Sequence, residues 1–248
     1  MTAGMRSSAA IDLRPWPNDP SVCHLILRDH VTVPAGTDVD RWVERVIERS
    51  DDPTVTIRTS ALFPEAATPF LARDFRAVDR LALLERRLRR PDDRTERTGA
   101  AAGSTTAIRL RRMSRRRLRA AVDIDRQAFG PVWANDLGSL RHAIAATPQV
   151  RVRIAQVDDE SVGFVVTGKA AHLGYLQRLA VVPDAQRRGV ARSLVEDGID
   201  WLTRGGATSV LVNTGLDNEP ALQLYRSLGF RRRPEELVVL ECTVPTGR

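Results

Sequence analysis

Hydrophobic and polar positions in the second half of the chain alternate with two different periods. Val150, Val152 and Ile154 are separated by arginines, which is the two-residue period of a half-buried strand, and the apolar run 175–182 is typical of a buried one. Over residues 190–202 the apolar side chains recur every three or four positions instead, which predicts an amphipathic helix. The pattern therefore predicts an α/β fold.

Capping residues mark where the helices begin and end. Gly205-Gly206 ends the helix that starts near residue 190. The helix after it has Asn218 as N-cap, Pro220 in its first turn and Gly229 at its end, and Ser114 caps an earlier one. A short helix is also expected over about residues 136–146. Further strands are predicted at residues 108–110, 150–154, 162–166, 209–213 and 237–242.

Composition limits the class of protein. With 248 residues and 42% hydrophobic content, the chain can form one large domain or two small ones. No apolar run approaches the ~20 residues that span a bilayer, and no signal-type apolar segment lies near residue 1. Cys23 and Cys242 are the only cysteines, which fits a reducing cytoplasm better than a disulfide framework. Neither they nor the four dispersed histidines form a metal-like cluster, so no metal is expected.

The net charge of +7 is concentrated in one segment. Residues 86–119 contain thirteen arginines and three acidic residues, so the rest of the chain is slightly acidic. Such a segment could contact nucleic acid or the ribosome, but it lacks the aromatic residues on which bases stack. Lys169 is the only lysine, so an arginine-biased composition explains the segment equally well. Nucleic-acid binding is therefore not favoured and is kept as an alternative.

The turn between the strand at 175–182 and the helix at 190 has the features of a phosphate-binding site. Gly189 lets the backbone come close to a ligand, and the amides and dipole of a helix N-terminus favour an anion. Arg187, Arg188 and Arg192 add positive charge. The turn suits a pyrophosphate, although an Arg-Arg-Gly sequence also occurs at ordinary helix starts.

Two motifs in order resemble a known family. Gln186-x-x-Gly189-x-Ala191 is followed about 30 residues later by Asn218-x-x-Ala221-x-x-Leu224-Tyr225-x-x-x-Gly229-Phe230. Together they resemble the GNAT superfamily of acetyl-CoA-dependent N-acyltransferases, in particular the branch that acetylates N-terminal amines of ribosomal proteins. The resemblance covers roughly residues 106–243. It implies a central mixed sheet flanked by helices, in the order β-α-α-β-β-β-α-β-α-β.

The resemblance implies acetyl-CoA as co-substrate and assigns residues to it. Backbone groups of Leu179, Ala180 and Val181 would pair with the pantetheine arm, and the Val181 amide would donate to the oxyanion. Asn218 is both a helix cap and, in the family, a contact to the cofactor. The pyrophosphate would lie on the turn formed by Gln186, Arg187, Arg188, Gly189, Val190, Ala191 and Arg192.

The resemblance also implies catalytic and acceptor residues. Tyr225 occupies the general-acid position, where a phenol can protonate a departing thiolate; the alternative is a core aromatic. The family's glutamate base is replaced by Asn213, which cannot take a proton but could orient a water that does. The candidate contacts to the acceptor amine are Phe129, Trp133, Tyr175 and Gln177.

The N-terminal part of the chain resembles the second half of the same fold. Residues 55–60 align with 210–215, and the same offset pairs Phe70 with Tyr225. Ala35-Gly36-Thr37-Asp38 replaces the phosphate turn, and its acidic residue disfavours an anion. We therefore expect this part to lack cofactor chemistry, with chance similarity as the alternative.

These observations predict three parts: a degenerate GNAT-like unit at 1–90, a polar linker at 91–106 and a GNAT N-acetyltransferase domain at 107–248. The expected function is transfer of an acetyl group from acetyl-CoA to a primary amine, either a protein N-terminus or a small amine, in a ternary complex. The alternatives are a non-catalytic acetyl-CoA-binding module, an adaptor acting through residues 86–119, and a tandem enzyme that makes a small thiol or acylates an antibiotic.

Overall fold

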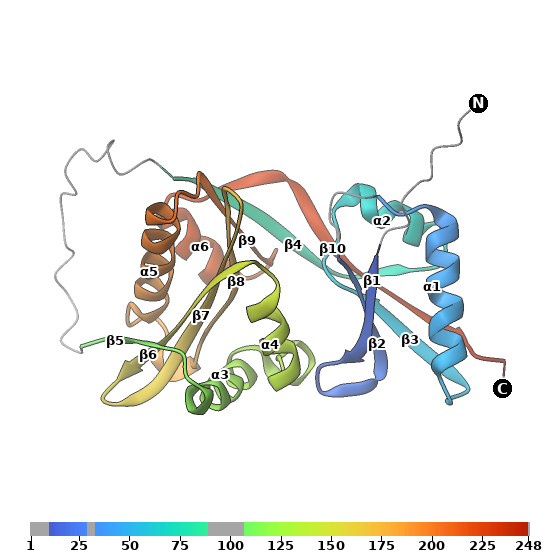
Figure 1. Cartoon of the computed structure of the whole chain (residues 1–248), viewed down its shortest axis with the longest axis horizontal. Coiled ribbons are helices and arrows are strands. Elements are labelled where there is room, and N and C mark those ends of the chain that lie inside the picture. The colour runs from blue at the N-terminus through green and yellow to red at the C-terminus, as the bar shows by residue number, and fades with distance from the viewer. Residues whose placement is uncertain (1–9, 29–32, 89–106, 248) are drawn as a thin grey trace. The chain divides into compact units, whose positions relative to one another are not determined.

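The structure is a computed structural model that describes residues 10–28, 33–88 and 107–247. These residues pack as two compact units (Figure 1). Unit 1 contains the chain up to Leu83, Gly215–Asp217 and the chain from Arg233 onwards, and unit 2 contains Leu84–Thr214 and Asn218–Arg232. The linker expected at 91–106 lies outside the described residues, and the expected domain boundaries stay a prediction.

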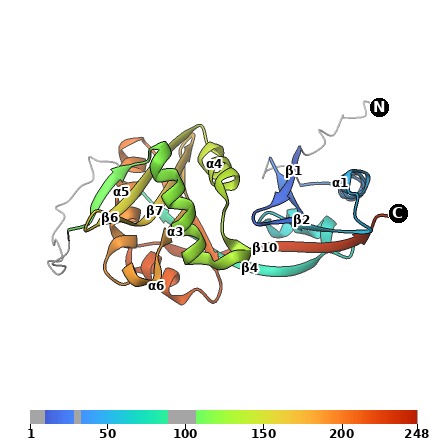
Figure 2. The same cartoon turned by 90° about the horizontal axis from the view of Figure 1, so that it is seen from below.

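Unit 1 is a sheet with two helices. Its strands follow the order β1-β2-β3-β10-β4, in which β2 and β3 are parallel and β10 is antiparallel to β3. Figure 2 shows the red β10 alongside the teal β4. The elements are β1 (Ile11–Trp16), β2 (Asp19–Leu27), α1 (Gly36–Arg49), β3 (Thr54–Thr59), α2 (Pro64–Leu71), β4 (Arg76–Arg87) and β10 (Arg231–Pro245).

The core of unit 1 lies between its helices and one face of the sheet. Leu25, Ile57 and Leu240 come from three neighbouring strands and are completely buried. They pack with Trp42 of α1 and Phe70 of α2, whose ring centroids are 6.0 Å apart. The core therefore depends on β10, a strand that lies far from the others in sequence.

β10 is longer than the strand predicted at 237–242. It runs from Arg231 to Pro245, and its last five residues pair with β3. The prediction was too short because the first residues of β10 are arginines and a proline, which show no apolar alternation.

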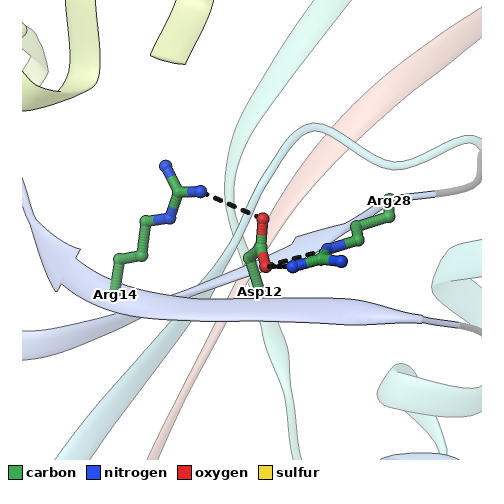
Figure 3. Close-up of polar contacts among 3 residues, drawn as sticks. All are labelled: Asp12, Arg14 and Arg28. Atoms are coloured by element: carbon green, nitrogen blue, oxygen red, sulfur yellow. Dashed lines mark hydrogen bonds and ion pairs between the residues drawn. The ribbon is translucent and has the colours of Figure 1, made fainter. Parts of the chain in front are cut away.

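Charged side chains occupy β1, which is the edge strand of the sheet in unit 1. Asp12 lies between Arg28 and Arg14, and it accepts hydrogen bonds from Arg28 Nε at 2.8 Å and Arg14 Nη2 at 3.0 Å (Figure 3). The bond from Arg28 is the main reason that the pKa of Asp12 lies below its ordinary value. Charges on an edge strand disfavour pairing with another chain.

From its first strand to its last helix, unit 2 has the element order that the resemblance implies, which confirms the expected fold; the final strand of that order, β10, belongs to unit 1 from Arg233 onwards. Its strands follow the order β9-β8-β7-β6-β5, and the end of β4 lies on the other side of β9. The elements are β5 (Arg109–Arg112), α3 (Arg115–Trp133), α4 (Leu137–Ala145), β6 (Gln149–Val157), β7 (Glu160–Ala170), β8 (Leu173–Val181), α5 (Val190–Arg204), β9 (Ser209–Gly215) and α6 (Glu219–Ser227).

Helices cover both faces of the sheet in unit 2, with α5 on one side of β7 and α3 and α4 on the other (Figure 1). Ile124 of α3 and Leu140 of α4 pack against Phe164 of β7 and Ala180 of β8. On the opposite face, Gly198 lets α5 approach the sheet, because a Cβ there would lie 2.7 Å from Thr167 Oγ1.

The predicted caps of this unit are confirmed. Ser114 Oγ accepts from Arg117 N at 3.4 Å, and Asn218 Oδ1 accepts from Ala221 N at 3.3 Å. α5 ends at Arg204, and Gly206 then adopts a φ of 76°.

Replacing Leu240 with alanine tests the contribution of β10 to unit 1. We expect a loss of about 2–5 kcal/mol in the free energy of unfolding, because the side chain is completely buried. Urea titration followed by circular dichroism measures it. Thr243→Ala, an exposed position on the same strand, is the control and should change stability by less than about 1 kcal/mol. Equal effects would contradict this account of the core.

Candidate active site

The parallel strands β8 and β9 pair over only a short stretch. The register ends where Tyr175 lies opposite Leu211. Residues 176–181 of β8 and 212–215 of β9 continue as strands, but the register does not pair them with each other. Backbone groups along this part of β8 are therefore available to a ligand that lies as an additional strand.

A β-bulge marks the point where β8 leaves β9. Val166 of β7 pairs with Arg178, whereas the next residue, Thr167, pairs with Leu176, so Gln177 is the extra residue on β8. A bulge bends its strand and increases the local twist. The bend coincides with the end of the pairing to β9 and accounts for the divergence of the two strands.

The turn between β8 and α5 contains two residues in the left-handed region. Arg187 has a φ of 57° and Gly189 a φ of 84°. A non-glycine residue in this conformation costs about 1–3 kcal/mol, and such turns direct backbone amides toward a common concave side that binds anions. A Cβ on Gly189 would meet only Ile108 Cδ1, at 3.9 Å, so there is space in front of the turn.

The N-terminus of α5 is electropositive. Its N-cap is Gly189, which has no side chain to cap the first amides, and its first turn contains no acidic residue. Arg187, Arg188 and Arg192 are all exposed. Arg192 Nη2 donates to Ser227 Oγ of α6 at 2.7 Å. Cations at a helix N-terminus oppose the helix dipole, so an anion bound there would offset an unfavourable arrangement.

Gln186 connects this turn to the end of β8. Its Nε2 donates to Val181 O at 3.3 Å. Val182 N donates to Val162 O of the β7 side at 2.9 Å. Since successive residues of a strand direct their amides to opposite sides, the Val181 amide is directed away from β7. That is the side on which β9 diverges.

Tyr225 lies inside α6, and its side chain is 4% exposed. Its ring packs against Phe230, with the two ring centroids 5.4 Å apart. Burial raises the pKa of the Tyr225 phenol above its ordinary value, so the hydroxyl keeps its proton at neutral pH. The residue combines the packing of a core aromatic with the protonation state of a potential acid.

The two asparagines of the candidate site differ in environment. Asn218 caps α6, as described above. Asn213 lies on the part of β9 that is not paired with β8 and is exposed, so its amide is accessible to water. The structure thus places Asn213 on one border of the gap between the strands.

A buried ion pair connects β8 to α3, and the predictions from the sequence missed it. Asp125 is completely buried and accepts from Arg178 Nε and Nη2, both at 2.7 Å. The guanidinium also donates to Trp133 O at 2.8 Å and lies 3.6 Å from the ring centroid of Phe129. The sequence contained one signal for this pair. Asp125 occupies an apolar position of the α3 pattern, and a buried carboxylate requires a partner.

The four predicted acceptor contacts fall into two groups. Phe129 and Trp133 lie at the end of α3, where Gly130 adopts a φ of 69° and interrupts the helix, and both contact Arg178. Tyr175 and Gln177 lie on β8 at the last paired position and at the bulge. Gln177 Oε1 is buried and has no hydrogen-bond partner among the described residues.

Unit 1 differs from unit 2 at the corresponding positions. Its parallel strands β2 and β3 stay paired as far as Leu25 opposite Thr59, and Ser60 N then donates to Leu25 O at 2.9 Å. The first turn of α1 contains an acidic residue, Asp38, whose Oδ2 accepts from Ala35 N at 3.0 Å. Within the described residues of unit 1, the parallel strands therefore show no such gap, and the helix start carries negative charge.

The arginine-rich segment 86–119 is only partly described. Arg86 donates to Leu228 O, Arg109 pairs with Asp159, and Arg117 donates to Arg112 O. Over the residues described, no group of three or more His, Cys, Asp or Glu is arranged to hold a metal ion. No helix within residues 10–28, 33–88 or 107–247 combines the length and hydropathy needed to cross a membrane.

The part of the chain that contains the gap between β8 and β9 matches a known family. Residues 118–230 match the model of the Acetyltransferase (GNAT) family. This part of the chain is therefore a domain of the GNAT family of acyltransferases.

Curated relatives match over part of the chain. N-alpha-acetyltransferase 30 of Schizosaccharomyces pombe is 31% identical over 84 residues, which are 32% of this chain and 56% of that protein. [Ribosomal protein bS18]-alanine N-acetyltransferase of Salmonella typhimurium is 38% identical over 73 residues, 29% of this chain and 49% of that protein. Mycothiol acetyltransferase of Renibacterium salmoninarum is 34% identical over 80 residues, which are 30% of this chain and 24% of that protein. The chain spans about half or less of the length of these relatives.

Solved structures share the fold over nearly the whole chain. A GCN5-related N-acetyltransferase from Sphaerobacter thermophilus matches with a TM-score of 0.61 and 15% identity, covering 96% of this chain and 77% of that one. A GCN5-related N-acetyltransferase from Kribbella flavida matches with a TM-score of 0.58 and 15% identity, covering 94% of this chain and 89% of that one. At this identity the likeness establishes the fold alone.

Replacing Gly189 with aspartate tests the anion site. We expect at least about a tenfold loss of affinity for CoA, because the new carboxylate repels phosphate at the helix N-terminus. Isothermal titration of the folded variant with CoA measures it. Gly189→Asn, similar in size but neutral, should lose less affinity.

Gly206→Asp is a control for backbone strain. Gly206 also has a positive φ, 76°, but follows the other end of α5. This variant should keep its affinity for CoA. Unchanged affinity in Gly189→Asp would contradict the assignment of this turn to phosphate.

Proposed function

We propose that this protein transfers an acetyl group from acetyl-CoA to a primary amine by direct attack in a ternary complex. The observation that carries the proposal is the divergence of β8 and β9 beyond Tyr175 and Leu211, next to an uncapped and electropositive start of α5. A gap of this kind accepts an extended arm along β8 and a pyrophosphate at the helix.

The residues near the gap fit acetyl-CoA. Backbone groups of Leu179, Ala180 and Val181 would hold the pantetheine arm as an additional strand. The turn from Gln186 to Arg192 would hold the pyrophosphate, because its left-handed residues expose amides, the first helical turn contains no acidic residue, and Arg187 and Arg188 are exposed. When bound, acetyl-CoA supplies the acetyl group as an activated thioester.

The oxyanion donor in this proposal is the Val181 amide. It is directed away from β7, on the side where β9 diverges, as argued above from the bond between Val182 N and Val162 O. A fixed backbone donor stabilises negative charge that develops on the thioester oxygen, and it requires no reorganisation during the reaction.

Proton transfer involves two side chains. The amine nitrogen forms the new bond to the acetyl carbon, the carbon–sulfur bond breaks, and Tyr225 donates its proton to the departing sulfur. Asn213 orients a water that receives the proton of the amine, since an amide side chain cannot take it. An α-amine has a pKa near ~8, so a sizeable fraction arrives neutral without a strong base.

The acceptor is either a protein N-terminus or a small amine. The relatives named above include enzymes for protein N-termini and for mycothiol, and each matches over only part of its length. Phe129, Trp133, Tyr175 and Gln177 are the proposed contacts to the acceptor. We further propose that the protein acts in the cytoplasm.

A module that binds acetyl-CoA without turnover is the second candidate, and the observation that favours it is Asn213 in the position of the family's base. The two candidates differ in CoA release. An enzyme releases CoA when acetyl-CoA and an amine are both present, whereas a binding module does not.

Replacing Tyr225 with phenylalanine tests the acid. We expect kcat to fall about 100-fold, while the dissociation constant of acetyl-CoA changes by less than about twofold because the ring and its packing remain. Steady-state release of CoA and isothermal titration measure the two quantities. Tyr175→Phe removes the other hydroxyl of this kind and should change the KM of the acceptor rather than kcat.

The pH dependence of kcat provides a second test of Tyr225 as the acid. Because burial raises the pKa of Tyr225, its ionisation should not lower kcat of the unchanged protein between about pH 7 and 10. Turnover of Tyr225→Phe equal to that of the unchanged protein would remove this residue as the acid.

The number of bound acetyl-CoA molecules tests the contrast between the two units. We expect one per chain, because β2 and β3 stay paired to the end of β3 and the first turn of α1 contains an acidic residue, so the described residues of unit 1 form no second site of this kind. The stoichiometry of an isothermal titration measures it. Two equivalent sites would contradict the interpretation of unit 1.

A further inference from the structure

We propose that Asp125 and Arg178 are positioning residues that hold the acceptor-binding segment 129–135 against the strand that binds the cofactor. The inference rests on the proposed function, in which this segment contacts the acceptor and residues 179–181 contact acetyl-CoA. Neither residue touches the reacting atoms in the proposal. Their role is to fix the relative position of the two substrates.

The β-bulge at Gln177 directs Arg178 toward α3. Before the bulge, Leu176 faces α5, since its Cδ2 lies 3.4 Å from a Cβ built on Gly198. After it, Ala180 packs with residues of α3 and α4. Side chains two residues apart share a face, so Arg178 faces the same way as Ala180. Without the extra residue, Arg178 would share the face of Leu176 and could not reach Asp125.

The ion pair is hydrogen-bonded to the acceptor segment. Asp125 accepts two bonds from Arg178 and a third from Asn135 N, at 2.6 Å. Arg178 donates in turn to Trp133 O and covers the Phe129 ring. Three residues of the segment are thus tied to one charged pair.

The segment needs such partners because its helix is interrupted. Gly130 has a φ of 69° and a ψ of −178°, so the helix is kinked there and only one further turn follows, closed by the bond from Ala134 N to Gly130 O at 3.1 Å. An unpaired buried backbone group costs about 1–3 kcal/mol. The pair satisfies Trp133 O and Asn135 N with charged partners, which form stronger bonds than neutral ones.

The segment presents apolar side chains while its backbone is held. Trp133 is 36% exposed and Val132 is 51% exposed. An exposed apolar surface on a fixed backbone is suited to contact an acceptor. A displacement of about 1 Å between reacting groups can reduce a rate about 100-fold, so loosening this segment should affect the acceptor more than the cofactor.

Asp125→Asn is the test variant, because it keeps the shape of the side chain and removes the charge. The amide can accept with one oxygen, but its NH₂ group then faces N–H donors of Arg178 or Asn135. Asp197→Asn is the matched control. Asp197 of α5 accepts from Arg151 Nε and Nη2 of β6 at 2.7 and 2.9 Å, which is the same kind of pair at a different place in unit 2.

Three quantities are measured on the full chain. The first is the KM of the acceptor, with a short peptide that begins with alanine and with phenethylamine as probes. The second is the dissociation constant of acetyl-CoA. The third is hydrogen exchange of residues 129–136, followed by mass spectrometry, which does not depend on activity.

We expect Asp125→Asn to raise the KM of the acceptor about 10- to 100-fold, to speed exchange in 129–136, and to leave the affinity for acetyl-CoA within about twofold. Asp197→Asn should change none of the three, although it lowers stability. Equal changes in both variants, or none in Asp125→Asn, would overturn the proposal.

Arg178→Lys is a second variant that tests the same positioning role if Asp125→Asn fails to fold. Lysine keeps the charge but cannot form the two parallel bonds to Asp125 together with the bond to Trp133 O. We expect the same rise in the KM of the acceptor, and kinetics like those of the unchanged protein would overturn the proposal. Absence of turnover by the unchanged protein with either probe would instead overturn the proposed function, and the acceptor role of the pair with it.

Discussion

The limited pairing between β8 and β9 is the constraint on which the rest of unit 2 depends. Two parallel strands normally satisfy each other's backbone groups along their length, and here they stop at Tyr175 and Leu211. The bulge at Gln177 bends β8 at that point, and the turn with its left-handed residues follows at the end of the strand. In unit 1 the corresponding strands remain paired. Both units contain the same kind of strand–helix–strand arrangement. A few backbone hydrogen bonds between the parallel strands thus account for the difference in their capacity to bind a ligand.

Charge is used differently on the two sides of β8. Toward α5, Arg187 and Arg188 are exposed and the first helical turn contains no acidic residue, whereas Arg192 pairs with Glu196 at 3.6 Å, so positive charge stays available to an anion. Toward α3 the single guanidinium of Arg178 is neutralised by a carboxylate that is completely buried. Removing one partner of a buried pair is costly, because the other charge stays without compensation. The first arrangement is suited to binding and the second to rigidity.

Much of unit 2 could be predicted from the sequence because its elements carry local signals. Periodicity and caps located α5 and α6, and two motifs indicated the fold. Three features could not be predicted. The length of β10 depends on its pairing with β3, which is a contact between distant segments. The partner of Asp125 is 53 residues away, so only the burial of a carboxylate was foreseeable. The bulge at Gln177 depends on the register of β7 against β8, and no local residue pattern marks it.

The position of β10 has a consequence for how the chain folds during its synthesis. In the sheet of unit 1 this strand lies between β3 and β4, although it follows residues 84–232, most of which belong to unit 2. The segments of unit 1 that leave the ribosome first therefore have no complete sheet to join until nearly all of the chain has emerged. Unit 2 can assemble most of its core before that point. Unit 1 is thus completed after unit 2 although its first strands are translated before unit 2, contrary to the usual order in which the domain translated first also folds first.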